Sequence, residues 1–297
     1  MGGKLAGIKI AMLGGDDREA ILHKELLHLG AEVEAVGVPG VSAGEDYNCH
    51  EALLKAVQGA GAIILPVRGI DQEGLIYAPQ SQFPLYITWE LAAAIPAGTP
   101  VLIGVARPLL KEMAAAHGWQ LYETADLDEM AILNAIPTAE GALLLAMQEL
   151  PITLHGSEAF VIGLGRTGFA LARVLDGVGA RVTVIDRGAA DRARAYREGW
   201  QAYPFSDMAN IIKQADVIFN TVPALVLTES LLAQTKPEVL IIDLASAPGG
   251  TDFEAAAALK RKALLAPGLP GKVAPKTAGL ILARIYPTLI LNSLQQP

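Results

Sequence analysis

A glycine-rich segment past the middle of the chain carries the residue types that hold a nucleotide phosphate. The stretch VIGLGRTG spans residues 161–168 and places Gly163, Gly165 and Gly168 in the pattern G-x-G-x-x-G. It follows an apolar strand pattern, opens a helix pattern, and precedes a second strand pattern that ends in Asp186. A dinucleotide-binding loop requires this strand–loop–helix–strand context. We therefore predict that backbone N–H groups at the start of the helix bind the pyrophosphate of a dinucleotide.

Two neighbouring segments bear on the identity and seating of that dinucleotide. Asp186 is placed to accept a hydrogen bond from the ribose 2′-OH of NAD, whereas Arg187 beside it could hold the 2′-phosphate of NADP, so both cofactors stay open. The segment NTVP (220–223) ends a further strand pattern and is expected near the nicotinamide, unless it is an ordinary turn. The predicted cofactor-binding residues are Gly163, Leu164, Gly165, Arg166, Thr167, Gly168, Asp186, Arg187, Asn220, Thr221, Val222 and Pro223.

Two later loops could meet a substrate. In DLASAPGGTDF (243–253), Asp243 ends a strand pattern and Ser246 lies in the flexible stretch after it. APGLPGKVAPKTAG (266–279) holds Lys272 and Lys276 just ahead of a helix pattern. A lysine beside free helix N–H groups predicts a carboxylate-binding corner. The alternatives are an ordinary turn with a hydrogen-bonded aspartate in the first loop and solvated lysines in the second.

Two arginines follow strand patterns in the first half of the chain. Arg18 lies in GGDDR and Arg68 in LPVRG. Either guanidinium could bind a carboxylate bidentately. The alternative for each is a surface ion pair, with Asp17 and Asp71 respectively.

The lack of a histidine in the second half of the dinucleotide-binding region argues against one dehydrogenase mechanism. His155 is the last histidine of the chain. Dehydrogenases of 2-hydroxy acids with a two-domain layout use a histidine late in the chain as general base, so that route is disfavoured. Closely spaced His, Cys, Asp and Glu residues, which would indicate a metal site, are also missing, and we predict none.

Composition and charge exclude some classes of partner. The 297 residues carry a net charge of −8 with a pI near 5.2, which argues against a nucleic-acid or anionic-membrane binder. Cys49 is the single cysteine, so a disulfide framework is impossible and a reducing compartment fits. The N-terminal segment lacks the long apolar stretch of a signal peptide. We expect a soluble, cytoplasmic protein.

Strand and helix patterns alternate from end to end, which is typical of parallel α/β sheets. The sequence predicts an α/β fold of two doubly wound, Rossmann-like parallel-sheet domains with a cleft between them. The predicted strands are 8–13, 33–37, 61–67, 100–106, 158–163, 181–186, 217–220, 239–243 and 263–267. The expected organisation is an N-terminal substrate and catalytic domain (1–133), a linking helix capped by Thr138 (134–151), an NAD(P)-binding domain (152–275), and a C-terminal helix interrupted by Pro287 that returns to the first domain (276–297).

Several segments together resemble one family. NAIPTAEGALLLAMQ, LHGSEAFVIGLGRTG, NTVPALVL, DLASAPGGTDF and ALLAPGLPGKVAPKTAGLILA occur in this order. They resemble the A subunit of dipicolinate synthase, and the resemblance is densest between residues 134 and 283. The first half matches more loosely, through IAMLGGDDRE and GAIILPV, and Arg68 lies outside the family's motif as it stands here.

The resemblance implies an activity and a partner. It implies an NAD(P)-dependent oxidation of a dihydrodipicolinate-type precursor to pyridine-2,6-dicarboxylate during spore formation, in the cytoplasm of the mother cell. It also implies a flavoprotein-like partner, the B subunit of dipicolinate synthase. We further expect a homo-oligomer.

Such a reaction assigns roles to the polar residues above. The two substrate carboxylates need cationic or N–H partners, a hydride leaves a ring carbon for the nicotinamide, and a proton leaves with it. Either Glu140 or Asp243 would take that proton. The predicted catalytic residues are Glu140, Asp243, Ser246 and Lys276, and the predicted substrate-binding residues are Thr138, Arg68, Lys276 and Thr277.

Two other functions stay open. The chain could be a regulatory protein that binds NAD(P)H without turning anything over. It could also be another oxidoreductase on the same plan, such as an amino-acid or methylene-folate dehydrogenase. The loops at 243–253 and 266–279 argue against the second of these.

Overall fold

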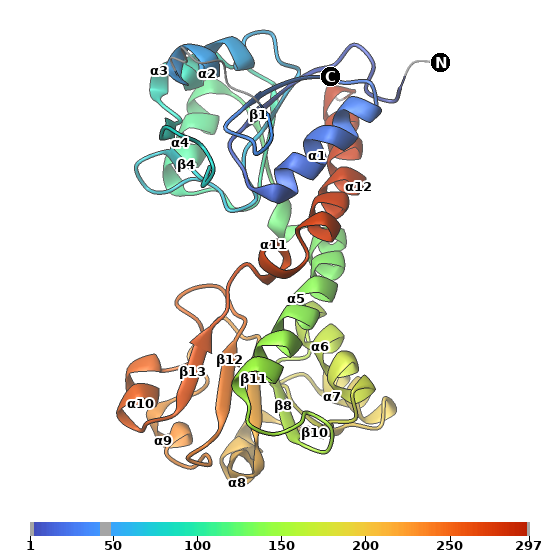
Figure 1. The fold of residues 1–297 in the computed structure, drawn as a ribbon, viewed down its shortest axis with the longest axis vertical. Helices are drawn as coiled ribbons and strands as arrows, with labels where there is room; N and C mark the ends of the chain where they lie inside the picture. The colour runs from blue at the N-terminus through green and yellow to red at the C-terminus, as the bar shows by residue number, and fades with distance from the viewer. Residues whose placement is uncertain (1–2, 42–48, 296–297) are drawn as a thin grey trace. The chain divides into compact units, whose positions relative to one another are not determined.

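The computed structural model describes residues 3–41 and 49–295 (Figure 1). It divides into two compact units, which are described separately below. Unit 1 comprises Met1–Ala131 with Ala274–Pro297, and unit 2 comprises Ile132–Val273.

Unit 1 is built on a parallel five-stranded sheet in the order β2-β1-β3-β6-β7. The central strands are buried along almost their whole length, so their runs of apolar residues are continuous rather than alternating. A short antiparallel hairpin, β4–β5, follows β3. The strands are β1 (Lys9–Leu13), β2 (Glu32–Val36), β3 (Ala62–Ile64), β4 (Leu75–Ile76), β5 (Leu85–Tyr86), β6 (Pro100–Ile103) and β7 (Gln120–Glu123).

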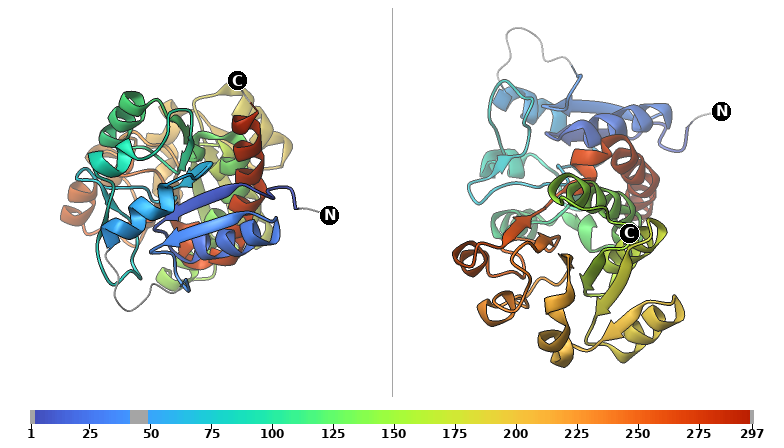
Figure 2. Two further views of the ribbon diagram at one scale, coloured as in Figure 1. Left: turned by 90° about the horizontal axis from the view of Figure 1, so that it is seen from above. Right: turned by 60° about the horizontal axis from the view of Figure 1, so that its bottom comes forward.

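Helices cover both faces of this sheet. One face packs against α2, α3 and α4 through a single apolar core. On the other face α12 runs alongside α1 (Figures 1 and 2). Their contact is close at Gly279, where an added Cβ would lie 2.6 Å from Ile21 Cβ and 2.7 Å from Arg18 O. The helices are α1 (Asp17–His28), α2 (Cys49–Val57), α3 (Trp89–Ala93), α4 (Pro108–His117) and α12 (Pro275–Leu294), with a short 3₁₀ turn, η1 (Thr124–Asp126).

Unit 2 is built on a parallel six-stranded sheet in the order β10-β9-β8-β11-β12-β13. Numbered within the unit, this is the 3-2-1-4-5-6 order of a dinucleotide-binding sheet, with the reversal of strand order between β8 and β11. The strands are β8 (Glu158–Ile162), β9 (Arg181–Ile185), β10 (Gln201–Tyr203), β11 (Val217–Asn220), β12 (Leu240–Asp243) and β13 (Lys262–Leu265).

Apolar cores lie on both faces of the unit 2 sheet. One contains residues of α5, α6 and α7, and the other contains residues of α8, α9 and α10. The helices of this unit are α5 (Asp128–Glu149), α6 (Arg166–Gly177), α7 (Ala189–Arg197), α8 (Met208–Ile211), α9 (Glu229–Leu232), α10 (Phe253–Ala258) and α11 (Leu269–Val273), and the 3₁₀ turns are η2 (Phe205–Asp207) and η3 (Ile212–Gln214). The first residues of α5 fall in unit 1.

The predicted fold class is confirmed, since both units are parallel α/β sheets. The expected start of the linking helix is wrong. Thr138 does not cap α5 but lies inside it, and its hydroxyl donates to the carbonyl of Asn134 one turn earlier at 2.7 Å. The helix begins ten residues upstream at Asp128, because acidic residues favour a helix N-terminus there and the buried alanine face extends back to Ala135.

Pro287 and two edge strands also differ from expectation. Pro287 does not interrupt the last helix, because α12 continues through it. The edge strands β7 and β10 escape prediction, because their sequences QLYE and QAY are short and only half apolar. Two helices, α5 and α12, are long and apolar enough to span a bilayer by length and composition alone. Half of the apolar window of α12 is buried, as in a core helix of a globular unit.

Candidate functional site

The glycine loop of unit 2 is shaped by close packing against the loop that follows β11. Gly163 has φ +87°, and a Cβ there would lie 2.5 Å from Thr221 Oγ1. A Cβ on Gly168 would lie 1.9 Å from Gly163 O, so only glycine lets α6 pass so near the end of β8. The Thr221 hydroxyl in turn donates to the Ile162 and Gly163 carbonyls, at 3.0 and 3.2 Å. The loop therefore stands at the reversal of strand order.

Gly165 has a different role, because nothing lies within 4 Å of where its Cβ would be. Its φ of −71° suits any residue, so glycine there leaves space rather than permitting a turn. That space is part of a cavity of about 650 Å³ in front of the first turn of α6. The described residues offer that helix start no side-chain cap, so its dipole faces open space. The arrangement fits a pyrophosphate.

Residues that follow the ends of four strands, β8, β9, β10 and β11, line this cavity. Seven of the twelve predicted cofactor-binding residues are among them. The lining residues are Gly163, Gly165, Asp186, Arg187, Gly188, Asp191, Phe205, Thr221, Val222, Pro223, Ala224 and Val226. Leu164, Arg166, Thr167, Gly168 and Asn220 were predicted with them and lie in the loop, the first turn of α6 and the end of β11 instead.

Asp186 joins the glycine loop to the bend after β9. Its Oδ2 accepts from Leu164 N and its Oδ1 accepts from Gly188 N, both at 2.7 Å. Arg192 steadies the same bend by donating to the carbonyls of Asp186 and Arg187, each at 2.8 Å. The Asp186 carboxylate is thus fixed at the cavity wall, with the exposed Arg187 next to it.

Asp243, predicted as a possible proton acceptor, has another role in this structure. It is fully buried, and its carboxylate accepts from Ala245 N, Gly250 N, Thr251 Oγ1 and Asn220 Nδ2. Asn220 is equally buried and also brackets Val222, accepting from its N–H and donating to its carbonyl at 3.0 Å. The pair therefore shapes the loops at the carboxyl ends of β11 and β12, and the alternative interpretation of Asp243, a hydrogen-bonded aspartate in a turn, fits the structure better.

Other predicted residues of unit 2 are accessible. Ser246 is exposed in the loop after β12. Glu140 is exposed on α5, and the neighbouring Gly141 packs that helix on α11, since its Cβ would lie 3.0 Å from Leu269 Cβ. Thr138, expected at a helix start, offers no free helix N–H group there because α5 is continuous through it.

The remaining predicted residues lie in unit 1. Lys276 and Thr277 lie in the first turn of α12, where both are exposed. Arg68 is exposed in the turn after β3, at the carboxyl edge of the sheet. Its predicted alternative partner, Asp71, instead accepts from Glu73 N and Leu75 N and so closes the following turn.

A buried cluster of charged residues at the carboxyl edge of the unit 1 sheet was not predicted from the sequence. For Arg18 the predicted alternatives were bidentate binding of a carboxylate or a surface ion pair with Asp17; it is instead buried, and its guanidinium donates to both carboxylate oxygens of Asp16 at 2.9 Å. Glu19 is only 1% exposed, and its carboxylate accepts from Asp16 N and Val67 N, both at 2.8 Å. The capping-box pattern Asp16–Glu19 was the sequence signal available for it.

The cluster shifts the ionisation of its members. Burial raises the pKa of Glu19 to about 7, against the opposing charge of Arg18. Burial also disfavours ionised Asp16, but the hydrogen bonds and charge of Arg18 outweigh it and lower the Asp16 pKa. Tyr286 of α12 lies close by, fully buried, with its hydroxyl 3.1 Å from Thr124 Oγ1, and burial raises its pKa.

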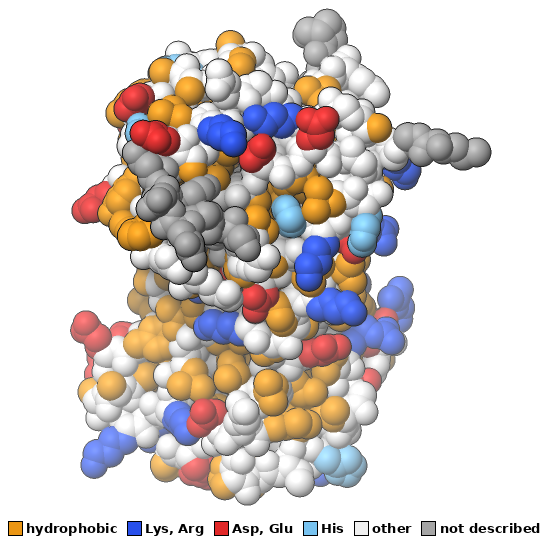
Figure 3. Space-filling view, turned by 45° about the horizontal axis from the view of Figure 1, so that its top comes forward, with side chains coloured by type: hydrophobic (Ala, Val, Ile, Leu, Met, Phe, Trp, Pro, Cys, Tyr) orange, Lys and Arg blue, Asp and Glu red, His pale blue; other side chains and the backbone are white. Residues whose placement is uncertain are grey.

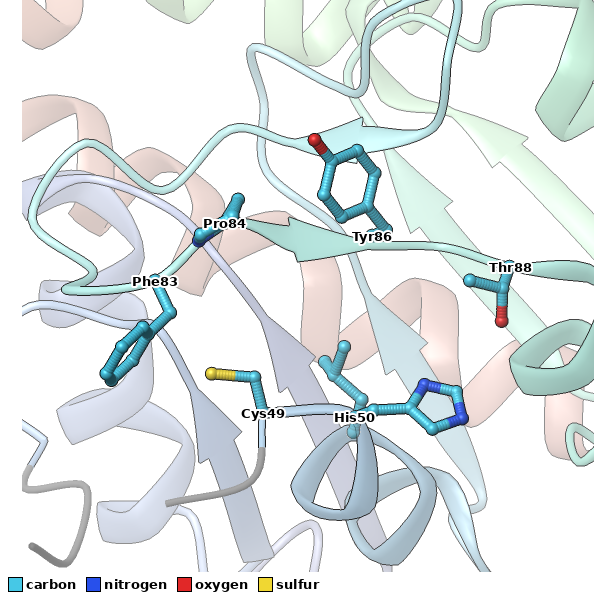
Figure 4. A pocket seen from close by; sticks show the side chains of 7 residues that line it. Cys49, His50, Phe83, Pro84, Tyr86 and Thr88 are labelled. Atoms are coloured by element: carbon cyan, nitrogen blue, oxygen red, sulfur yellow. The ribbon is translucent and has the colours of Figure 1, made fainter. Parts of the chain in front are cut away.

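Unit 1 also holds a smaller cavity, of about 430 Å³, between α2 and the β5 strand (Figure 4). Aromatic and aliphatic side chains dominate its wall, with Cys49 at the first turn of α2. His50 beside it pairs with Glu90 at 3.1 Å. Elsewhere on the surface, the face in Figure 3 intersperses Lys and Arg with Asp and Glu side chains among apolar ones.

Two family models match the chain along its two units. The N-terminal domain of the A subunit of dipicolinate synthase matches residues 9–125. The NAD-binding domain of D-isomer specific 2-hydroxyacid dehydrogenases matches residues 140–269. The A subunit of dipicolinate synthase from Bacillus subtilis is 37% identical over 290 residues, covering 96% of this chain and 97% of the relative. The chain belongs to the family of dipicolinate synthase A subunits.

Solved structures agree with this membership. The A subunit of dipicolinate synthase from Bacillus halodurans superposes with a TM-score of 0.89 at 34% identity, covering 99% of each chain. The protein from Bacillus subtilis gives 0.88 at 36% identity, covering 97% of each chain. A transhydrogenase from Sinorhizobium meliloti, at 0.62 and 16% identity over 96% of this chain and 95% of its own, shares the fold alone. Unit 2 is therefore an NAD(P)-binding domain of dehydrogenase type, which confirms the predicted cofactor class.

Proposed function

We propose that this chain oxidises a dihydrodipicolinate-type precursor to pyridine-2,6-dicarboxylate. The observation that carries the proposal is the open cradle at Gly165, closed on one side by Asp186, in a chain of this family. Bound NAD(P)⁺ supplies the hydride acceptor: one hydride and one proton leave the dihydro ring, which becomes aromatic. NADP and NAD are both candidates, since Asp186 and Arg187 line the cavity together.

The two carboxylates of the substrate need positive partners. Lys276 and Thr277 begin α12, where a lysine adds its charge to the positive end of a long helix. Arg68 offers a guanidinium at the carboxyl edge of the unit 1 sheet. We assign one carboxylate-binding role to the start of α12 and another to Arg68.

We assign removal of the ring proton to Glu140 rather than to Asp243. Glu140 is exposed and can meet a substrate, whereas Asp243 is enclosed by its four hydrogen-bond donors. Ser246 is assigned a hydrogen bond to the ring or its carboxylate, because it is exposed in the loop after β12. Aromatisation of the ring supplies driving force, so a weak base suffices.

The setting of the reaction is part of the same proposal. The relatives are named as one subunit of a synthase, and we propose a heteromeric complex with its flavoprotein-like B subunit and self-association of this chain. We place the complex in the cytoplasm of the mother cell of a sporulating bacterium.

The test is a turnover assay with the purified chain, with and without the B subunit. Precursor generated by an aldolase is mixed with NAD⁺ or NADP⁺, and the absorbance of reduced cofactor is followed together with the ultraviolet bands of pyridine-2,6-dicarboxylate. Joint appearance of both supports the proposal. Cofactor binding with no product under any combination would replace it with the regulatory function.

A further inference from the structure

Arg68 is held in one orientation although its side chain reaches the surface. Its guanidinium carbon sits 4.6 Å from the centroid of the Tyr77 ring, and its Nη1 donates to Tyr77 Oη at 3.4 Å. Within residues 3–41 and 49–295, Arg68 has no carboxylate partner. A stacked guanidinium without an ion pair keeps its charge available for a ligand.

The outer edge of this guanidinium matches a carboxylate. Nη1 engages Tyr77, while the Nε–Nη2 edge makes no hydrogen bond to the described part of the chain. Two parallel N–H donors on that edge suit two oxygens of one planar carboxylate. A lysine at this position would present a point charge without that geometry.

Backbone hydrogen bonds fix the main chain on both sides of the Arg68–Tyr77 contact. Gly69 N donates to Pro66 O at 2.8 Å and closes the turn that carries Arg68. Tyr77 N donates to Gly69 O at 3.2 Å, and Tyr77 O accepts from Gly15 N at 2.8 Å. The ring and the guanidinium are therefore fixed to the loops that follow β1 and β3.

The buried carboxylate of Glu19 links the loops after β1 and β3 through two hydrogen bonds. Its Oε2 accepts from Asp16 N in the loop after β1, and its Oε1 accepts from Val67 N, the residue before Arg68. The side chain is 1% exposed, and the Asp16 end of the bridge is held in addition by the Arg18 fork. A substitution of Glu19 is therefore expected to shift the main chain of Arg68, because Val67, which donates to Glu19, directly precedes Arg68.

We propose that Tyr77 and Glu19 are positioning residues that set Arg68 as a fork for one carboxylate of the substrate. The proposal rests on the proposed function, since that function supplies the dicarboxylate. Tyr77 orders the side chain of Arg68, and Glu19 orders its main chain. Neither residue touches the ligand.

The test measures binding of pyridine-2,6-dicarboxylate to the full-length chain by isothermal titration calorimetry, with NAD(P)H binding as a second readout. Arg68→Lys is expected to weaken dicarboxylate binding by about tenfold or more. Tyr77→Leu is expected to weaken it by about two- to fivefold, and Tyr77→Phe by less, because the ring that carries the stack remains. Arg107→Lys is the matched control at the same sheet edge, with dicarboxylate affinity unchanged. NAD(P)H affinity should be unchanged throughout.

A double-mutant cycle isolates the positioning role. Glu19→Gln should weaken dicarboxylate binding in the wild-type background but not in the Arg68→Lys background, because its effect passes through Arg68. Equal loss in both backgrounds would overturn the role of Glu19. If Glu19→Gln does not fold, the same cycle is run with Tyr77→Leu, and equal loss in both backgrounds there overturns the proposal.

The outcomes separate this inference from the proposed function. If the wild type binds and oxidises its substrate while Arg68→Lys binds the dicarboxylate equally well, the inference is wrong and the proposed function stands. If the wild type neither binds a pyridine dicarboxylate nor turns over its precursor, the proposed function fails and the inference fails with it.

Discussion

Burial of Glu19 predicts a pH dependence of the stability of unit 1. The pKa of this carboxyl rises from 4.5 in a solvated chain to about 7 in the fold, chiefly because burial penalises the charged form. Between these two values the folded state binds more protons than the unfolded state, so the free energy of unfolding falls as pH rises. The loss begins above the unfolded pKa and is complete above the folded one. A shift of this size corresponds to about 3 kcal/mol at 1.36 kcal/mol per pH unit.

Glu19→Gln removes the titration while keeping the shape of the side chain. The variant loses one hydrogen bond, because its amide nitrogen cannot accept from Val67 N or Asp16 N, at a cost of roughly 1–3 kcal/mol at any pH. Relative to the wild type, however, it should gain about 3 kcal/mol between pH 5 and pH 8. The difference between the two proteins should therefore shrink or reverse as pH rises.

The assay must report on unit 1 alone, because two units need not unfold together. Trp89 and Trp119 lie in unit 1, and Trp200 lies in unit 2. Trp200→Phe is a suitable background, since the Trp200 Nε1 is buried without a hydrogen-bond partner in the described structure. Urea unfolding followed by tryptophan fluorescence at pH 5, 6, 7 and 8 then gives the unit 1 free energy.

The matched control is Glu25→Gln, the same exchange at a more exposed position of α1. It should follow the wild-type pH profile. If Glu19→Gln differs from the wild type by the same free energy at every pH, Glu19 does not titrate in this range and the reasoning from burial fails.

Three further substitutions test the cofactor cradle, the helix packing of unit 1 and the role of Asp243. Gly165→Val places a side chain in the cavity and should weaken NAD(P)H binding tenfold or more (~1.4 kcal/mol or more), measured by fluorescence titration, with an unchanged circular dichroism spectrum; full affinity would contradict the cradle. Gly279→Val forces α12 from α1 and should destabilise unit 1 by about 1–3 kcal/mol, measured by urea unfolding, without moving the unfolding of unit 2. Asp243→Asn should destabilise unit 2 by about 1–3 kcal/mol per buried donor left unpaired, measured by urea unfolding with Trp200 retained as the fluorescent reporter; a stable variant that only lost turnover would instead restore Asp243 as a catalytic residue.

Periodicity and glycine spacing were enough to predict both parallel sheets apart from the edge strands β7 and β10, and the glycine loop between β8 and α6. The strand patterns are strong because parallel strands are buried on both faces. The glycine spacing is recognisable because it recurs in a strand–loop–helix context, although Gly163 packs against Thr221 from a distant loop and only Gly168 is required by a contact within that unit. The start of α5 was missed because Thr138 is a good cap residue in isolation, while Asp128 and the buried alanine face decided where the helix begins.

The roles of the buried polar residues could not be predicted from their positions in the sequence alone. Asp243 sits at a strand end, where a catalytic carboxylate and a structural one look alike in sequence. Only the fold brings four donors to it from Asn220 and from the loop after β12. Arg18 likewise has several acidic neighbours, and the capping geometry of α1 selects Asp16 rather than Asp17. The hydrogen-bond partners of Asp243 and Arg18 depend on tertiary contacts, which residue spacing does not reveal.

Hydride transfer to the nicotinamide can be followed with an isotope. A precursor labelled with deuterium at the ring carbon that loses its hydride is incubated with the chain, the B subunit and NAD(P)⁺, and the reduced cofactor is analysed by mass spectrometry. We expect one deuterium on the nicotinamide ring for each pyridine-2,6-dicarboxylate formed. Product formed with unlabelled cofactor, and the deuterium recovered in water, would show that this chain does not transfer the hydride.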